Sequence, residues 1–142
     1  MRHDELIGKV QALAHLPDRG STERATQSVL RTLAERLPAG LAEHMAAQLP
    51  EGLAAYVRET TASAARDGRP SSTGEPFDLT VFAGRVAGRA GTTEDAALQY
   101  CAAVLEVLDA AVSPEVMGKL ADALPADIRG LLPVARAEGP TA

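Results

Sequence analysis

The chain has 142 residues, of which 46% are hydrophobic, and its formal net charge is −5. This size and composition are typical of one ordinary folded domain. It contains 28 alanines, no tryptophan, and only four aromatic side chains, Tyr56, Phe77, Phe82 and Tyr100. The bias toward helix formers excludes a large β-sheet, and so few aromatic residues argue against a stacking platform for bases or an aromatic cage for cations.

Charge and apolar runs restrict the partners and the compartment. Residues 71–142 hold 5 basic and 10 acidic side chains, which argues against nucleic acid because phosphate contacts need clustered cations. The longest uncharged apolar stretch, residues 96–105, is far shorter than the roughly 20 residues that cross a bilayer. With a single cysteine, Cys101, and no signal-peptide pattern after Met1, we expect a cytoplasmic protein without a membrane partner.

Four helices are predicted in the first half of the chain. The first spans residues 4–16, where Leu6, Val10 and Leu13 follow i, i+4, i+7 spacing and form one apolar face. The second spans residues 22–37 and the third spans residues 39–48. Pro50 ends the third helix and opens the fourth, because proline lacks the N–H that an interior turn needs but suits a first turn.

A linker and four further helices are predicted in the second half. Residues 67–77 are rich in glycine, proline and serine, so they form the linker. Helices follow over residues 79–90, 93–112 and 114–123, and a last one opens at Pro125. Thr92, with Asp95 three residues later, has the form of a capping box, and Ser113 before Pro114 has the form of an N-cap. Residues 138–142 are predicted to be a flexible tail.

The two halves align when the sequence is shifted by 76 and then by 75 residues. The shift matches Gly8-Lys9-Val10 with Gly84-Arg85-Val86, Val29-Leu30 with Val104-Leu105, Leu33 with Leu108, and Leu49-Pro50 with Leu124-Pro125. Each half is near the lower size limit of independent stability. We therefore predict an all-α fold of about eight helices, in which two tandem, pseudo-symmetric four-helix repeats, residues 1–66 and 78–137, pack into one compact bundle.

These matched segments also carry a resemblance. The run from Phe82 to Ala87 near a helix start, the Ala-Val-Leu-x-x-Leu of residues 103–108, and the two Leu-Pro pairs resemble the bacterial domain-of-unknown-function family 2267. The resemblance covers residues 2–132 and implies an all-α fold and a bacterial protein. It implies no activity, because no reaction or catalytic residue is assigned to that family.

Lys9 and Arg85 are the one cationic pair among the matched positions, where the others are apolar, glycine or proline. Each lies one place before a valine of the first helix of its repeat, so the stem can lie on the core while the charge stays at the rim. Two interpretations are open for both residues. They bind an anion or a carboxylate ligand, or they form structural ion pairs.

The other reactive side chains give no catalytic or metal-binding pattern. His3, His15 and His44 have no second histidine or cysteine at ligand spacing, so we expect no metal. Cys101 falls on an apolar stripe, where burial makes a thiol inert. No phosphate-cradling glycine loop is present, so we expect no nucleotide cofactor and assign no catalytic residue.

Three functions remain as hypotheses. The leading one is a non-catalytic protein-interaction or self-association module that uses a groove or face between the two halves, with a second copy or another protein as its partner. The second is a small-molecule binder with an apolar pocket between the repeats. The least favoured is an enzyme built from residues distant in sequence.

Overall fold

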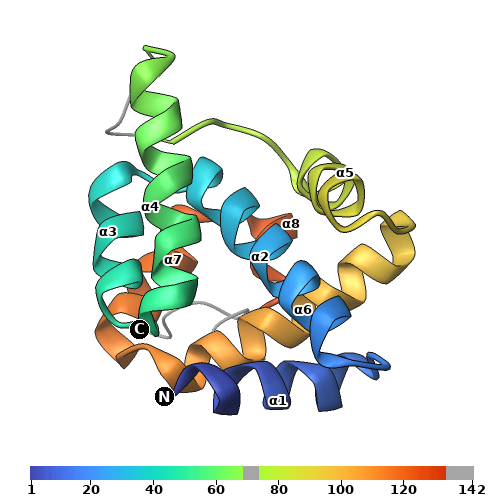
Figure 1. The fold of residues 1–142 in the computed structure, drawn as a ribbon. Helices are drawn as coiled ribbons and strands as arrows, with labels where there is room; N and C mark the ends of the chain where they lie inside the picture. Colours follow the sequence, from blue (N-terminus) through green and yellow to red (C-terminus); the bar gives the residue numbers. More distant parts are fainter. Residues whose placement is uncertain (69–73, 134–142) are drawn as a thin grey trace.

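The computed structural model describes residues 1–68 and 74–133, and this part of the chain contains α-helices and no strand (Figure 1). The helices are α1 (His3–Ala14), α2 (Arg19–Arg36), α3 (Ala39–Ala47), α4 (Glu51–Arg66), α5 (Leu79–Ala90), α6 (Glu94–Ala111), α7 (Pro114–Ala123) and α8 (Ala126–Arg129). The predicted all-α fold of about eight helices is confirmed. None of these helices is both long and apolar enough to cross a membrane.

The helix boundaries follow local hydrogen bonds. α5 and α7 coincide with their predicted ranges. α1 ends at Ala14 because His15 adopts a left-handed backbone, with φ 55°, and its N–H donates to the carbonyl of Gln11. α2 begins at Arg19, earlier than predicted, because the side chain of Asp18 accepts the N–H of Ser21 at 2.7 Å. α8 has 4 residues where α4 has 16, so the last helix of each half differs in length.

One predicted N-cap is confirmed and one is wrong. Ser113 caps α7, since its Oγ accepts the N–H of Val116 at 3.2 Å. The capping box placed at Thr92 is off by one residue, because Thr93 is the N-cap of α6. The Thr93 Oγ1 accepts the N–H of Ala96 at 3.2 Å, whereas the Thr92 N–H donates to the carbonyl of Ala87 and so belongs to the end of α5.

The core is one apolar cluster built from both halves of the chain. The two 18-residue helices, α2 and α6, contact each other and supply its centre, where Leu33 and Leu108 are buried. Phe82, Met45 and Met117 are fully buried around them. The compact packing of the two halves agrees with the predicted single bundle.

The predicted apolar face of α1 needs a correction. Leu6, Ile7, Val10 and Ala14 are buried, but Leu13 is 44% exposed. The buried stripe follows i, i+1, i+4, i+8, which places Leu13 on its edge, next to solvent. The prediction therefore chose the correct helix and two of its three core positions.

The helices of the two halves contact each other reciprocally. α1, the first helix of one half, contacts α6, the second helix of the other; α5 likewise contacts α2. In addition, α3 contacts its counterpart α7. Two related halves would give this arrangement, and the tandem repeat itself stays a prediction.

The positions of α2 and α6 lead to a stability prediction. Leu33→Ala and Leu108→Ala should each lower the free energy of unfolding by roughly 2 to 5 kcal/mol, since each removes a buried side chain and leaves a cavity. Urea unfolding followed by circular dichroism measures this. Val81→Ala is the control, because Val81 is 41% exposed. Near-neutral effects of both leucine substitutions would contradict the assigned core.

Candidate functional site

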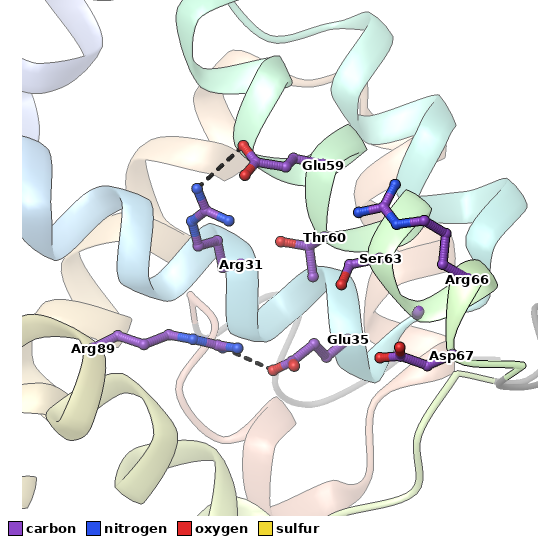
Figure 2. A pocket seen from close by; sticks show the side chains of 9 residues that line it. Arg31, Glu35, Glu59, Thr60, Ser63, Arg66, Asp67 and Arg89 are labelled. Carbon is purple, nitrogen blue, oxygen red and sulfur yellow. Dashed lines mark hydrogen bonds and ion pairs between the residues drawn. The ribbon is translucent and has the colours of Figure 1, made fainter.

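A hollow of about 210 Å³ opens between α2, α4 and α5 (Figure 2). It is lined mainly by charged and hydroxyl-bearing side chains, namely Arg31, Glu35, Glu59, Thr60, Ser63, Ala64, Arg66, Asp67 and Arg89. Three arginines and three carboxylates are among them, so the lining has no formal net charge. Because α2 and α4 precede the predicted linker and α5 follows it, we call this hollow the seam pocket.

Arg31 is held in place on the α4 side of the seam pocket. Its guanidinium lies over the ring of Tyr56, 5.2 Å from the ring centroid. Its Nη2 donates to Oε2 of Glu59 at 3.3 Å. The Arg31 side chain is 23% exposed and that of Glu59 is 63% exposed, so stacking fixes the cation while the carboxylate stays in solvent. Arg31 keeps further N–H donors for another acceptor.

Arg89 forms the opposite wall and joins α5 to α2. Its Nη1 donates to Oε1 of Glu35 and to Oγ1 of Thr32, both at 2.7 Å. The Glu35 side chain is only 11% exposed, so its charge is stabilised mainly by protein cations. Thr32 in turn donates to the carbonyl of Ser28 one turn earlier. This chain of hydrogen bonds fixes the geometry of the α2–α5 wall.

Arg85 lies behind that wall and outside the lining of the seam pocket. Its two terminal nitrogens donate to the two carboxylate oxygens of Glu75 at 3.0 and 2.7 Å, and Nη1 also lies 3.3 Å from Oε1 of Glu35. The guanidinium stacks on Phe77, 4.2 Å from the ring centroid. The hydrogen bond with Glu75 is the main cause that raises the pKa of Arg85 above its ordinary value.

Residues 74–78, which we call the strap, run along the C-terminal end of α2. The N–H of Glu75 donates to the carbonyl of Glu35 at 2.9 Å, and Nε of Arg36 donates to the carbonyl of Phe77 at 3.0 Å. Gly74 has φ +70°, and a Cβ there would lie 2.7 Å from the carbonyl carbon of Arg36. Residues 74–77 of the strap are the end of the predicted linker. Residues 67–68 form a turn after α4, and residues 69–73, like the predicted tail at 138–142, lie outside the described part.

Lys9, the matched counterpart of Arg85, has a different environment. Its Nζ lies 3.5 Å from Oε2 of Glu5 on the same helix, and both side chains are about half exposed. Lys9 and Arg85 therefore lie on different helices and each has its own acidic partner. Their proposed role in anion binding stays a prediction.

The histidines and the cysteine lie elsewhere. Nε2 of His3 is 2.7 Å from Oε1 of Glu23, and His44 is exposed on α3. Within residues 1–68 and 74–133, no group of three His, Cys, Asp or Glu side chains is arranged to hold a metal ion. Cys101 is buried, and desolvation raises the pKa of its thiol to about 12. Such a thiol stays protonated at neutral pH.

Sequence reasoning did not identify the residues of the seam pocket. A signal for them exists on each helix separately. Arg31 and Glu35 are four residues apart on α2, and Glu59, Ser63 and Arg66 follow helical spacing on α4. Such spacings are common on solvated helix faces, so only the fold distinguishes this set by placing the two faces beside Arg89.

The fold and site define an all-α protein with a polar pocket between its two halves. Comparison with family models then gives its relationship: the model described as "Uncharacterized conserved protein (DUF2267)" matches residues 3–131, and the chain belongs to this family. The resemblance noted in the sequence is thereby confirmed. A search among curated proteins found no match.

Gly74 and Gly68 allow a matched test of the strap. Both have positive φ, but a Cβ at Gly68 would meet nothing within 4 Å, whereas one at Gly74 would overlap the carbonyl group of Arg36. Gly68→Ala should cost about 1 kcal/mol through backbone strain, and Gly74→Ala should cost more because the strap must also move. Urea unfolding of the two variants measures the difference. Equal losses would mean that the strap does not lie against α2.

Arg85 and Lys9 form a second matched comparison. Arg85→Gln should lower the free energy of unfolding by about 1 to 2 kcal/mol, since it removes a partly screened bidentate pair and leaves Glu35 with one cation fewer. Lys9→Gln should leave the unfolding midpoint nearly unchanged, because its pair is solvated. The double variant Arg85→Gln/Glu75→Gln should lose less than the sum of the single losses. Equal effects at Arg85 and Lys9 would refute the assigned role of the strap.

Proposed function

We propose that this protein is a non-catalytic protein-interaction module that binds its partner at the seam pocket. The observation that carries the proposal is the convergence of Arg31, Glu59 and Arg66 with Arg89 and Glu35 around one hollow between the halves. Side chains of both signs from three helices meet there. Such a surface suits the charged side chains of another protein.

The preorganisation of the arginines supports a binding role. Arg31 is stacked on Tyr56 and Arg89 is bonded to Thr32, so neither side chain has to be ordered fully when a partner arrives. Arginines held in this way are frequent among residues that dominate interface energies. The non-catalytic part of the proposal rests on the sequence: the matched positions of the two halves are apolar, glycine or proline apart from Lys9 and Arg85.

The second hypothesis, a small-molecule binder with an apolar pocket, receives no support from the seam pocket. Ala64 is the one apolar residue of its lining. A small molecule at this place would have to be charged or strongly polar, which differs from the ligand that an apolar pocket takes. A bacterial cytoplasm remains the proposed location, and the single buried thiol of Cys101 is compatible with it.

Differential capture tests the proposal. The tagged wild-type chain and the variant Arg31→Gln are compared by quantitative mass spectrometry of proteins that co-purify from cells of the source organism. The partner should be recovered about tenfold less by the variant, which corresponds to ~1.4 kcal/mol of binding free energy.

The matched control is Arg24→Gln, since Arg24 is exposed on α2 two turns away and does not line the pocket. Circular dichroism and urea unfolding must show that both variants fold as the wild type does. Equal recovery by all three chains would refute binding at the seam pocket.

A further inference from the structure

The outer face of α4 borders the seam pocket and is exposed to solvent. Leu53, Val57 and Thr60 on the inner face are buried, whereas Glu59 and Ser63 on the outer face are exposed. The C-terminal end of α4 extends beyond the neighbouring helices (Figure 1). The exposed residues at this end of α4 are therefore accessible to a partner.

Two opposite charges lie on this face at a regular spacing. Glu59 and Arg66 are seven residues apart, which is about two helical turns, or ~10.5 Å along the axis. The Glu59 side chain is 63% exposed. Arg66 is exposed and forms no ion pair with any residue in the described ranges. The Arg66 guanidinium is thus available to an external carboxylate.

Two copies of α4 that lie antiparallel would have complementary charges, because Glu59 of one copy would lie opposite Arg66 of the other. If two α4 helices cross antiparallel with the two-fold axis between Ala62 and Ser63, Glu59 of each copy faces Arg66 of the other. Both ion pairs form at once, because a two-fold contact repeats every interaction. At the crossing point Ala62 and Ser63 are small and exposed, so the backbones can come close. Antiparallel helix dipoles are also favourable.

We propose that a second copy of this chain occupies this face, through an antiparallel α4–α4 contact paired by Glu59 and Arg66. The inference rests on the proposed function, since it names the partner at the same site. The contact closes the α4 side of the seam pocket and leaves Arg31 beside Glu59 at its edge. The ion pairs are solvent-accessible, so association weakens as salt is added.

Charge exchange tests the contact. Association of the purified full chain is measured by sedimentation equilibrium at low ionic strength. Glu59→Arg and Arg66→Glu should each weaken association by about tenfold or more, because each places like charges opposite one another. The double variant Glu59→Arg/Arg66→Glu restores both intermolecular pairs with reversed signs but places a second cation beside Arg31 within each copy, so it should recover part of the lost association.

The control is Glu115→Lys on α7, which changes the net charge as Glu59→Arg does but disrupts only the exposed pair between Glu115 and Lys119. A wild-type chain that is monomeric at every concentration overturns the inference. So does a double variant that remains as weak as the single ones. Circular dichroism confirms that each variant is folded.

Cross-linking gives a second readout that does not depend on charge. Ser63→Cys places a thiol beside the two-fold axis, so oxidation should join two copies of this variant. Cys101 is buried, so the wild-type chain should give no cross-link under the same conditions. Glu106→Cys, at an exposed position on α6, should remain monomeric. Equal cross-linking of both variants overturns the proposed axis.

The two proposals fail separately. A monomeric wild type that still captures another protein in an Arg31-dependent way overturns the second copy as partner and leaves the interaction module intact. A dimer that shows charge rescue, with no protein captured through Arg31, supports the second copy and removes the external partner.

Discussion

The environment of α2 is the constraint on which the rest of the structure depends. This helix contacts α1, α4, α5 and α6, so most of its surface is withdrawn from water. Four of its hydroxyl-bearing residues, Thr22, Thr26, Ser28 and Thr32, are buried, and each donates to the carbonyl four residues earlier. Because these hydroxyl groups are satisfied within the helix, their burial needs no polar partner on a neighbouring helix.

The packing of α2 determines which of its charged side chains reach the surface. Arg31 and Glu35 lie on the part of α2 that faces the gap between α4 and α5, where the seam pocket opens. Glu35 is the less exposed of the two and is bound by Arg85 and Arg89 of α5. Removing its cations would leave a nearly buried charge unpaired, which is costly. Glu35 therefore adds a polar connection between α2 and α5 to their apolar packing.

Glu35 also connects the seam pocket with the strap. Its carboxylate faces Arg89 in the pocket wall, while its backbone carbonyl accepts the N–H of Glu75. Arg85 joins the two, since it contacts both Glu35 and Glu75. A change in the strap thus reaches the pocket wall through two residues. This coupling explains why the end of a linker rich in glycine, proline and serine has a defined path.

Much of the fold could be predicted because it depends on local signals. Ser113 caps α7 with its own side chain, as predicted, and apolar spacing marks the buried faces of α2 and α6. One error arises where two local signals compete. Thr92 and Thr93 are adjacent hydroxyl residues, and only the end of α5 at Gly91 decides which one caps α6.

The seam pocket could not be predicted in the same way, because its pairs connect distant parts of the sequence. Arg31 and Glu59 are 28 residues apart, and Glu35 and Arg89 are 54 residues apart. No helical spacing relates them. They meet only because α4 and α5 pack on α2. Apolar spacing shows which face of each helix is buried, but it does not show which other helix that face contacts.

The residues at the aligned positions show why Lys9 and Arg85 have different environments although the sequence aligns them. The shift of 75 residues matches Glu35 with Ala110, and the shift of 76 residues matches Phe77 with Met1. The position that corresponds to Arg85 therefore has neither the carboxylate nor the ring that hold Arg85. Lys9 instead pairs with Glu5 on its own helix.

The same alignment shows that the α2–α5 contact and the α1–α6 contact differ in their charged residues. They match Arg31 with Glu106 and Arg89 with Leu13, so the charges that line the seam pocket have no counterparts of the same sign at the α1–α6 contact. An acidic and an apolar residue stand there, and Leu13 is exposed. If the halves arose by duplication, the apolar core was kept in both copies while polar recognition developed at one seam. A binding role at the α2–α5 seam is compatible with this divergence, because a surface needed only once has no reason to be repeated.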